Sequence, residues 1–241
     1  MYSLIIDIGN SRSKIFAVES DKPKIVYSAI YENPDDLKKV FTLYPQIRNG
    51  IYSATGHVDG NMTDFLNAKL DKLIRFTSEI PVPIKNSYKT PETLGSDRLA
   101  TAVGANLFFP DTNLVIFDFG TAITVDFVDA DGSFTGGNIS PGLSVRFKAL
   151  NCYTNSLPLL SPPEKITEIG TCTKTAIEAG VVHGIIGETM YYIKKYPSRK
   201  IIFTGGDAFY FARQIKCPIF VFSNSAVFGL NKILIHNCTE I

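Results

Sequence analysis

One short pattern occurs twice in the chain, and this repetition constrains the fold more than any other feature. Each copy has an apolar run, an aspartate, one apolar residue, a glycine and a small polar residue. The aspartates are Asp7 and Asp118, and the glycines are Gly9 and Gly120, an offset of 111 residues in each case. A second apolar run follows each glycine, which predicts two strands joined by a tight turn. The offset is nearly half of the 241 residues and too long for a solenoid repeat, so it predicts a duplicated domain.

We therefore expect an α/β fold of two tandem lobes, residues 1–112 and 113–241, with a nucleotide cleft between them. Helical spacing of apolar residues predicts a helix after Ser96, its natural N-cap, and a long helix over 173–196. Residues 200–204 read as a strand that runs into Gly205 and Gly206. Residues 136–142 read as a loop.

Charge and composition exclude several classes of protein. Lys and Arg number 24 and Asp and Glu 23, a net charge of +1, which argues against a nucleic-acid partner. No apolar run approaches the ~18–20 residues of a membrane span, and the start of the chain does not resemble a signal peptide. The 4 cysteines and 3 histidines are scattered, which argues against zinc and suits a reducing compartment. We expect a soluble cytoplasmic enzyme.

The repeated turn has the chemistry of a phosphate site. Glycine allows a large anion to approach the backbone closely, and successive turn amides form an anion-binding concavity. The aspartate would hold a cation that the phosphate shares, and Lys14 could reach the same phosphates. Two such turns facing each other would bind a polyphosphate from both sides. Gly205 and Gly206 would add a third approach point with room for a base or ribose.

Each feature also has an ordinary structural explanation. A single Asp-x-Gly after a strand is usually only a hairpin turn. Asp97 could simply favour a helix N-terminus through the helix dipole. The Gly205-Gly206 pair could be a common tight connection between a strand and a helix. The second copy of the turn at the corresponding place favours a functional site over these alternatives.

The motifs together resemble those of the actin-like ATPase (ribonuclease H-like) fold, which sugar kinases and heat-shock ATPases share. In their order they resemble the type III pantothenate kinases. Residues 7–14 look like the first phosphate motif of that family. Tyr88 followed by Gly95–Arg98 looks like its substrate signature, and residues 118–124 look like its second phosphate motif. The resemblance runs from Asp7 to the last helix. The sequence departs from the family pattern around residues 53–56, and Cys172 occupies a variable place.

The resemblance implies ATP-dependent phosphorylation of pantothenate, the first step of coenzyme A synthesis, in a homodimer. Asp97 would be the catalytic base, Asp7 would position Mg²⁺ through water, and Asp118 would hold K⁺ or ammonium. Thr173 would come from the second subunit. The implied ATP contacts are Asp7, Ile8, Gly9, Asn10, Ser11, Arg12, Ser13, Lys14, Thr121, Gly205 and Gly206. The implied pantothenate contacts are Tyr88, Gly95, Ser96, Asp97, Arg98 and Thr173.

Two alternatives remain open from the sequence. One is another small-molecule kinase, or a phosphatase, of the same fold. The other is a non-catalytic nucleotide-binding accessory factor for transcription. The three carboxylates Asp7, Asp97 and Asp118 argue against the second alternative, because a pure scaffold has no need of them.

Overall fold

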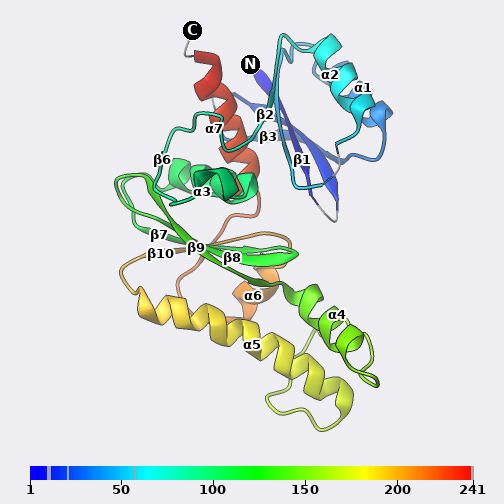
Figure 1. The fold of residues 1–241 in the computed structure, drawn as a ribbon, viewed down its shortest axis with the longest axis vertical. Coiled ribbons are helices and arrows are strands. Elements are labelled where there is room, and N and C mark those ends of the chain that lie inside the picture. The colour runs from blue at the N-terminus through cyan, green and yellow to red at the C-terminus, as the bar shows by residue number, and fades with distance from the viewer. Residues whose placement is uncertain (10–11, 21, 57, 240–241) are drawn as a thin grey trace. The chain divides into compact units, whose positions relative to one another are not determined.

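Two β-sheets flanked by helices make up the computed structural model, which describes residues 1–9, 12–20, 22–56 and 58–239 (Figure 1). By its contacts the chain divides into two compact units. The first unit contains residues 1–112, 128–136 and 224–241, and the second contains 113–127 and 137–223. Each unit is described by itself below. The lobe boundary expected between residues 112 and 113 stays a prediction.

The first unit is built on a five-stranded sheet. Its strand order is β3 (Ile25–Ile30), β2 (Ser13–Glu19), β1 (Tyr2–Ile8), β4 (Asn49–Ala54) and β5 (Lys72–Arg75). Strand β1 pairs antiparallel with β2 and parallel with β4. The expected first hairpin is therefore present. Strand β4 lies on the other side of β1, with Ser53 as the parallel partner of Asp7.

A second sheet repeats this order. Its strands are β11 (Phe220–Val221), β10 (Lys200–Thr204), β7 (Leu114–Phe119), β8 (Ala122–Val128) and β9 (Ser133–Pro141), with β6 (Lys85–Asn86) added beside β9. Strands β9, β8, β7, β10 and β11 take the places of β3, β2, β1, β4 and β5. Strand β7 pairs parallel with β10, as β1 does with β4. The central strand of each sheet carries its aspartate one residue before the strand ends. The predicted duplication is confirmed at the level of strand order.

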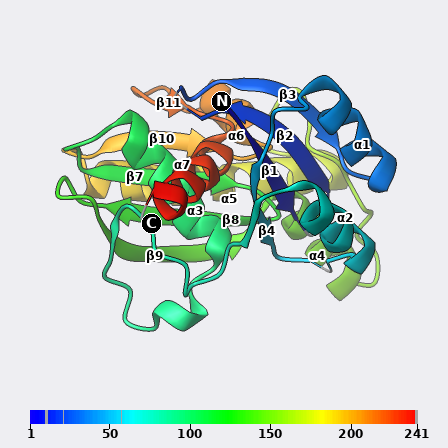
Figure 2. The ribbon, with the colours of Figure 1, turned by 90° about the horizontal axis from the view of Figure 1, so that it is seen from above.

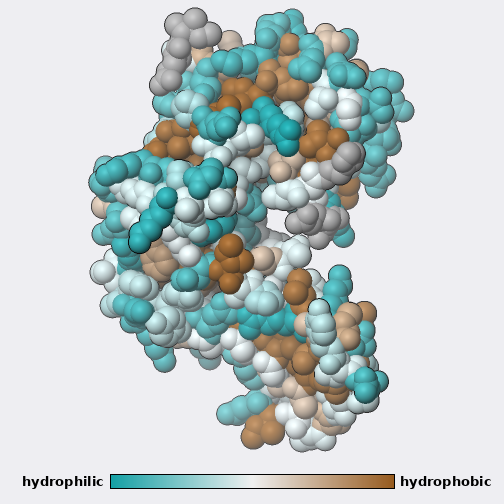
Figure 3. Space-filling model, viewed as in Figure 1, coloured by the Kyte–Doolittle hydropathy of each residue, from teal (hydrophilic) through white to brown (hydrophobic). Residues whose placement is uncertain are grey.

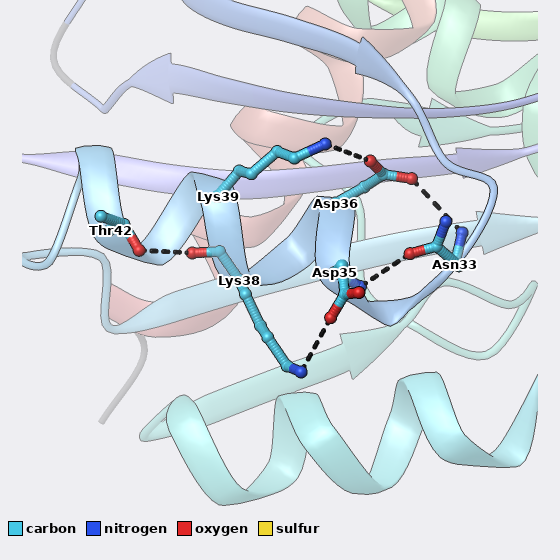
Figure 4. A network of polar contacts seen from close by, with 6 residues as sticks. All are labelled: Asn33, Asp35, Asp36, Lys38, Lys39 and Thr42. Carbon is cyan, nitrogen blue, oxygen red and sulfur yellow. Dashed lines mark hydrogen bonds and ion pairs between the residues drawn. The ribbon is translucent and has the colours of Figure 1, made fainter.

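Helices α1 (Pro34–Leu43) and α2 (Gly60–Lys69) pack against one face of the first sheet (Figure 1). Their buried residues meet Leu4 and Ile6 of β1 in one apolar core. Helix α1 begins with a capping box at Asn33, whose side chain accepts from the Asp35 N–H at 3.0 Å. Two lysines pair with acidic residues one turn earlier on the same helix (Figure 4). These local contacts account for a helix that begins at Pro34.

Helices α3 (Ser96–Phe108) and α7 (Ser225–Thr239) lie side by side in the same unit (Figure 2). The two helices approach closely because glycines face the partner backbone. A Cβ on Gly104 would lie 1.9 Å from the Ser225 carbonyl oxygen, and one on Gly229 would lie 1.8 Å from that of Ala100. Helix α7 also contacts β1 and β4. The C-terminal helix therefore buttresses the elements that carry Asp7 and Asp97.

The second unit carries α4 (Leu143–Tyr153), α5 (Thr173–Lys195) and α6 (Ala208–Gln214). A cluster of phenylalanines fills its core, with ring centroids of Phe119 and Phe203 4.7 Å apart and those of Phe119 and Phe211 4.9 Å apart. The long helix expected over 173–196 is confirmed. In the part of the chain that is described, no helix has both the length and the apolar character needed to cross a membrane.

One expectation about the backbone is wrong. Residues 136–142 were expected to form a loop, but residues 133–141 form strand β9. The glycines Gly136 and Gly137 occur inside this strand for steric reasons. Gly136 has a φ of 116°, and a Cβ on Gly137 would lie 2.1 Å from the carbonyl oxygen of Val125. Gly137 therefore permits a close approach to β8, Gly136 supplies a left-handed backbone conformation, and neither signals a turn.

Candidate active site

The first repeated turn lies at the end of β1. Asp7 is paired across the hairpin with Lys14 of β2, which places an acidic and a basic residue on opposite strands. The Gly9 N–H donates to the Arg12 carbonyl at 3.2 Å and closes the turn. A Cβ on Gly9 would lie only 3.0 Å from that carbonyl oxygen, so a larger residue would push against the turn. Asn10 and Ser11 of the same motif lie outside the described residues.

The end of β4 braces this turn and was not identified from the sequence. The backbone N–H and the side-chain hydroxyl of Thr55 both donate to the Ile8 carbonyl, at 2.9 and 3.3 Å. Ser53 is the parallel partner of Asp7 and is buried. Its hydroxyl lies 3.1 Å from that of Ser96. Ser53 therefore links the strand beside Asp7 to the start of α3.

Helix α3 begins differently from the expectation. Gly95 is the N-cap, and Ser96, expected as the cap, is the first helical residue. The Ser96 hydroxyl contacts Ser53 and does not cap the helix. The Arg98 N–H donates to Asp97 Oδ1 at 2.8 Å, and a Cβ on Gly95 would lie 2.6 Å from that oxygen. The glycine before Asp97 therefore leaves the space that its carboxylate occupies.

Asp7 and Asp97 interact electrostatically within the first unit. Burial raises the pKa of Asp7 above its ordinary value, the negative charge of Asp97 raises this pKa further, and Lys14 acts in the opposite direction. Asp97 itself is exposed. A half-buried carboxylate near a second one is an unfavourable arrangement that a divalent cation would relieve, and oxygen ligands suit Mg²⁺. The residues present therefore fit a cation beside Asp7.

Tyr88 and Arg98, both implied pantothenate contacts, lie together in the first unit. The Arg98 side chain is buried, and its guanidinium carbon lies 5.6 Å from the centre of the Tyr88 ring. Asp97 is the neighbour of Arg98 on the first turn of α3. The structure therefore brings a carboxylate, a guanidinium and an aromatic ring together near the first turn of α3.

The second repeated turn lies at the end of β7. Asp118 is the parallel partner of Thr204 in β10, as Asp7 is of Ser53 in β4. The Gly120 N–H donates to the Ala122 carbonyl at 3.1 Å, which closes the turn. The exposed Thr121 follows Gly120 and accepts through its carbonyl from the Gly142 N–H at 3.0 Å. Gly142, the N-cap of α4, was not identified as part of this turn from the sequence.

The Gly205-Gly206 loop lies against the second turn. Gly205 has a φ of 91°, and a Cβ there would lie 2.4 Å from Asp118 Oδ1. Gly206 is exposed, and a Cβ there would meet nothing within 4 Å. The Asp207 N–H donates to the Phe119 carbonyl at 3.1 Å, and burial raises the pKa of the Asp207 carboxyl. Glycine is thus required at 205 for conformation and space, while Gly206 leaves an open surface.

Thr173 is the first residue of α5. It is exposed and lines a cavity of about 930 Å³ between α4 and α5. The other lining residues are mainly apolar, among them Leu150, Leu157, Ile177 and Val181. The hydropathy view shows brown, apolar surface over this part of the second unit (Figure 3).

The described residues contain no cluster of three or more Asp, Glu, His or Cys side chains that could enclose a metal ion. A cation at Asp7 or Asp118 would therefore need further oxygen ligands from water, backbone or a bound phosphate. Magnesium sites at nucleotides are commonly built in this way, from one or two carboxylates and the substrate phosphates.

The fold and these turns define a class of protein. A Clostridium difficile structure, an activator of 2-hydroxyisocaproyl-CoA dehydratase with bound ADPNP, matches with a TM-score of 0.57 at 18% identity over 100% of this chain and 96% of that one. This similarity shows the fold alone. Two sheets of repeated strand order, each with an Asp-x-Gly turn after its central strand, give the chain the fold of the actin-like ATPases and sugar kinases.

The family follows from closer relatives. The family model for type III pantothenate kinase matches residues 3–195. A type III pantothenate kinase of Phocaeicola vulgatus is 40% identical over 98% of each chain. One from Porphyromonas gingivalis is 38% identical over 98% of this chain and 99% of its own. The chain belongs to the type III pantothenate kinase family, as its motifs predicted.

Proposed function

We propose that this kinase transfers the terminal phosphoryl group of ATP to the primary hydroxyl of pantothenate, with Asp97 as the base. Family membership over the full chain supports the reaction, which is the first step of coenzyme A synthesis. The observation that carries the role of Asp97 is its placement. It is exposed on the first turn of α3, and its carboxylate accepts a hydrogen bond from the Arg98 N–H. Its negative charge raises the pKa of Asp7.

The remaining chemistry is mainly positioning and charge neutralisation. Phosphoryl transfer passes through a loose transition state, so a carboxylate is an adequate acceptor for the hydroxyl proton. Asp7 would hold Mg²⁺ through water, and the backbone and side chains of residues 8–14 would contact the phosphates. The proposed ATP contacts in the second unit are Thr121, Gly205 and Gly206. The metal, when bound, offsets negative charge on the phosphates.

Asp118 is proposed as the ligand of a monovalent cation, K⁺ or ammonium. Two observations support this assignment. Asp118 Oδ1 lies where a side chain at position 205 would be, and Thr121, three residues after Asp118, is exposed. Asp118→Ala is expected to weaken the rise in rate on adding K⁺, because it removes the carboxylate oxygen. K⁺ titrations at constant ionic strength, for wild type and variant, measure this response. A K⁺ titration that is unchanged in the variant contradicts the assignment.

We further propose a homodimer in which Thr173 reaches the pantothenate site of the second subunit. The apolar lining of the α4–α5 cavity beside Thr173, and the exposure of Tyr153 at 88%, support this face as the subunit contact. Thr173→Ala should raise the KM for pantothenate by roughly 2- to 12-fold through loss of one hydrogen bond. Kinetics with a thermal melt check this. Thr171→Ala, an exposed threonine two residues earlier, is the control. Equal effects in both variants exclude the role of Thr173.

The choice of acceptor is tested by competition. Pantothenate and other small hydroxyl acids or sugars are supplied together with ATP, and the depletion of each is followed. Pantothenate should be consumed first. Faster consumption of any other acceptor contradicts the proposed substrate. The proposed compartment is the cytoplasm, supported by the free cysteines Cys152, Cys172, Cys217 and Cys238.

A further inference from the structure

Phe134 is a fully buried phenylalanine of β9, at 0% exposure, and lies outside the phosphate motifs and the substrate signature. Its ring lies beside Arg98. The guanidinium carbon of Arg98 is 5.9 Å from the centre of the Phe134 ring and 5.6 Å from that of Tyr88. The two ring centroids are 6.2 Å apart, with planes inclined at 48°. One buried guanidinium therefore lies over two aromatic rings at once.

The backbone around Phe134 ties these rings together. Phe134 pairs with Asn86 in the parallel register of β6 and β9, and its carbonyl accepts from the Ser87 N–H at 2.9 Å. The Tyr88 N–H in turn donates to the Asn86 side chain at 3.1 Å. The segment that carries Tyr88 is thus anchored to the strand that carries Phe134.

Gly136 completes the arrangement two residues after Phe134. A Cβ on Gly136 would lie 3.5 Å from Tyr88 Cδ2, so the glycine backbone packs against the edge of the Tyr88 ring. Its φ of 116° is a conformation that other residues rarely adopt. The packing against Tyr88 and the positive φ together explain why β9 contains a glycine at position 136.

We propose that Phe134 is a positioning residue, whose ring, with that of Tyr88, holds the Arg98 guanidinium in the orientation that binds pantothenate. A cation over the face of an aromatic ring is attracted by the ring's quadrupole, and burial strengthens this attraction. A guanidinium held this way loses few conformations when it binds a ligand. The proposal rests on the proposed function only for the identity of that ligand.

The first test is kinetic. Phe134→Leu should raise the KM for pantothenate by roughly 3- to 30-fold, because it removes one aromatic face from Arg98. The KM for ATP should stay within twofold. Phe16→Leu removes a ring of the same size from β2, where Phe16 is 4% exposed, and should leave both constants unchanged. If Phe134→Leu melts below the assay temperature, Phe134→Met replaces the ring with an apolar chain of similar volume and takes its place.

A double-mutant cycle separates positioning from general packing. If Phe134 acts through Arg98, then Phe134→Leu adds little to the pantothenate KM once Arg98→Met, which removes the cation, is present. If Phe134 only supports the fold, the two changes multiply. A multiplied effect, or an unchanged KM in Phe134→Leu, overturns the proposal.

The last readout is independent of turnover. The Nε–H resonance of Arg98, assigned by its loss in Arg98→Lys, should be shifted upfield by the two rings in the wild type. Phe134→Leu should remove part of this shift, and Phe16→Leu should not. An unchanged resonance in Phe134→Leu contradicts the arrangement itself. If the wild type shows the shift but does not phosphorylate pantothenate, the proposed function fails while the role of Phe134 in holding Arg98 stands.

Discussion

Asp97→Asn is expected to lower kcat by about 10²- to 10⁴-fold, the contribution typical of a positioned acid or base. The asparagine amide has nearly the shape of the carboxylate, so the start of α3 should be kept. It cannot take the proton of the substrate hydroxyl, however. ATP affinity should be unchanged within twofold, because the proposed nucleotide contacts come from the repeated turns and the Gly205-Gly206 loop.

The control for this variant is Glu92→Gln, an exposed carboxylate five residues earlier. It removes the same charge from the same stretch of chain and should leave kcat within twofold. Steady-state kinetics and a nucleotide-binding titration on both variants suffice. Full activity in Asp97→Asn would remove Asp97 as the base, and lost ATP binding would assign it to the nucleotide.

Asp7→Asn is expected to abolish turnover and at the same time to raise the melting temperature. Burial and the charge of Asp97 raise the pKa of Asp7, which means that the folded protein resists ionising this group. An acid with a raised folded pKa stabilises the fold less as pH rises through that pKa. The neutral amide removes this penalty, and each kcal/mol gained raises the melting temperature by roughly 2–4 °C in a chain of this size.

The gain in melting temperature of Asp7→Asn should depend on pH. The gain in melting temperature should be largest above the folded pKa of Asp7, where the wild-type carboxylate is ionised. It should shrink as pH falls, because the wild-type group then becomes protonated and neutral like the amide. Asp64→Asn, on the exposed face of α2, is the matched control and should show no such gain. A lower melting temperature for Asp7→Asn at neutral pH would contradict the electrostatic account.

The duplicated strand order could be predicted because its signal is local. An apolar run followed by Asp-x-Gly and a second apolar run encodes a hairpin within about 15 residues, and its recurrence at Asp118 needs no tertiary information. The long helix from Thr173 was predictable for the same reason, since its apolar residues keep helical spacing over many turns.

Other features depend on partners distant in the sequence. Ser96 has the residue type of a helix cap, but its hydroxyl meets Ser53, 43 residues earlier, and Gly95 takes the cap position. The strand over 133–141 contains glycines that suggest a loop. Their reasons are distant in the sequence: Gly137 packs against Val125 of β8, and Gly136 packs against the Tyr88 ring. Thr55, which braces the first turn, has no local signature either. Local patterns cannot specify such contacts.

The candidate site also combines features that local motifs identify with features that only the structure shows. The sequence identified Asp7, Asp97 and Asp118 through motif order, and the structure adds the electrostatic link between the first two. It also adds the close packing of Gly205 against Asp118. The roles of these residues in binding and catalysis remain predictions for experiment.

The most direct measurement is ADP release with ATP, Mg²⁺ and pantothenate, run once with K⁺ and once with Na⁺ at equal ionic strength. Turnover should require pantothenate and be faster in K⁺. Turnover without pantothenate would indicate an ATPase or a different acceptor. No turnover in either salt, from a protein that melts cooperatively, would contradict the assignment of this chain as a working pantothenate kinase.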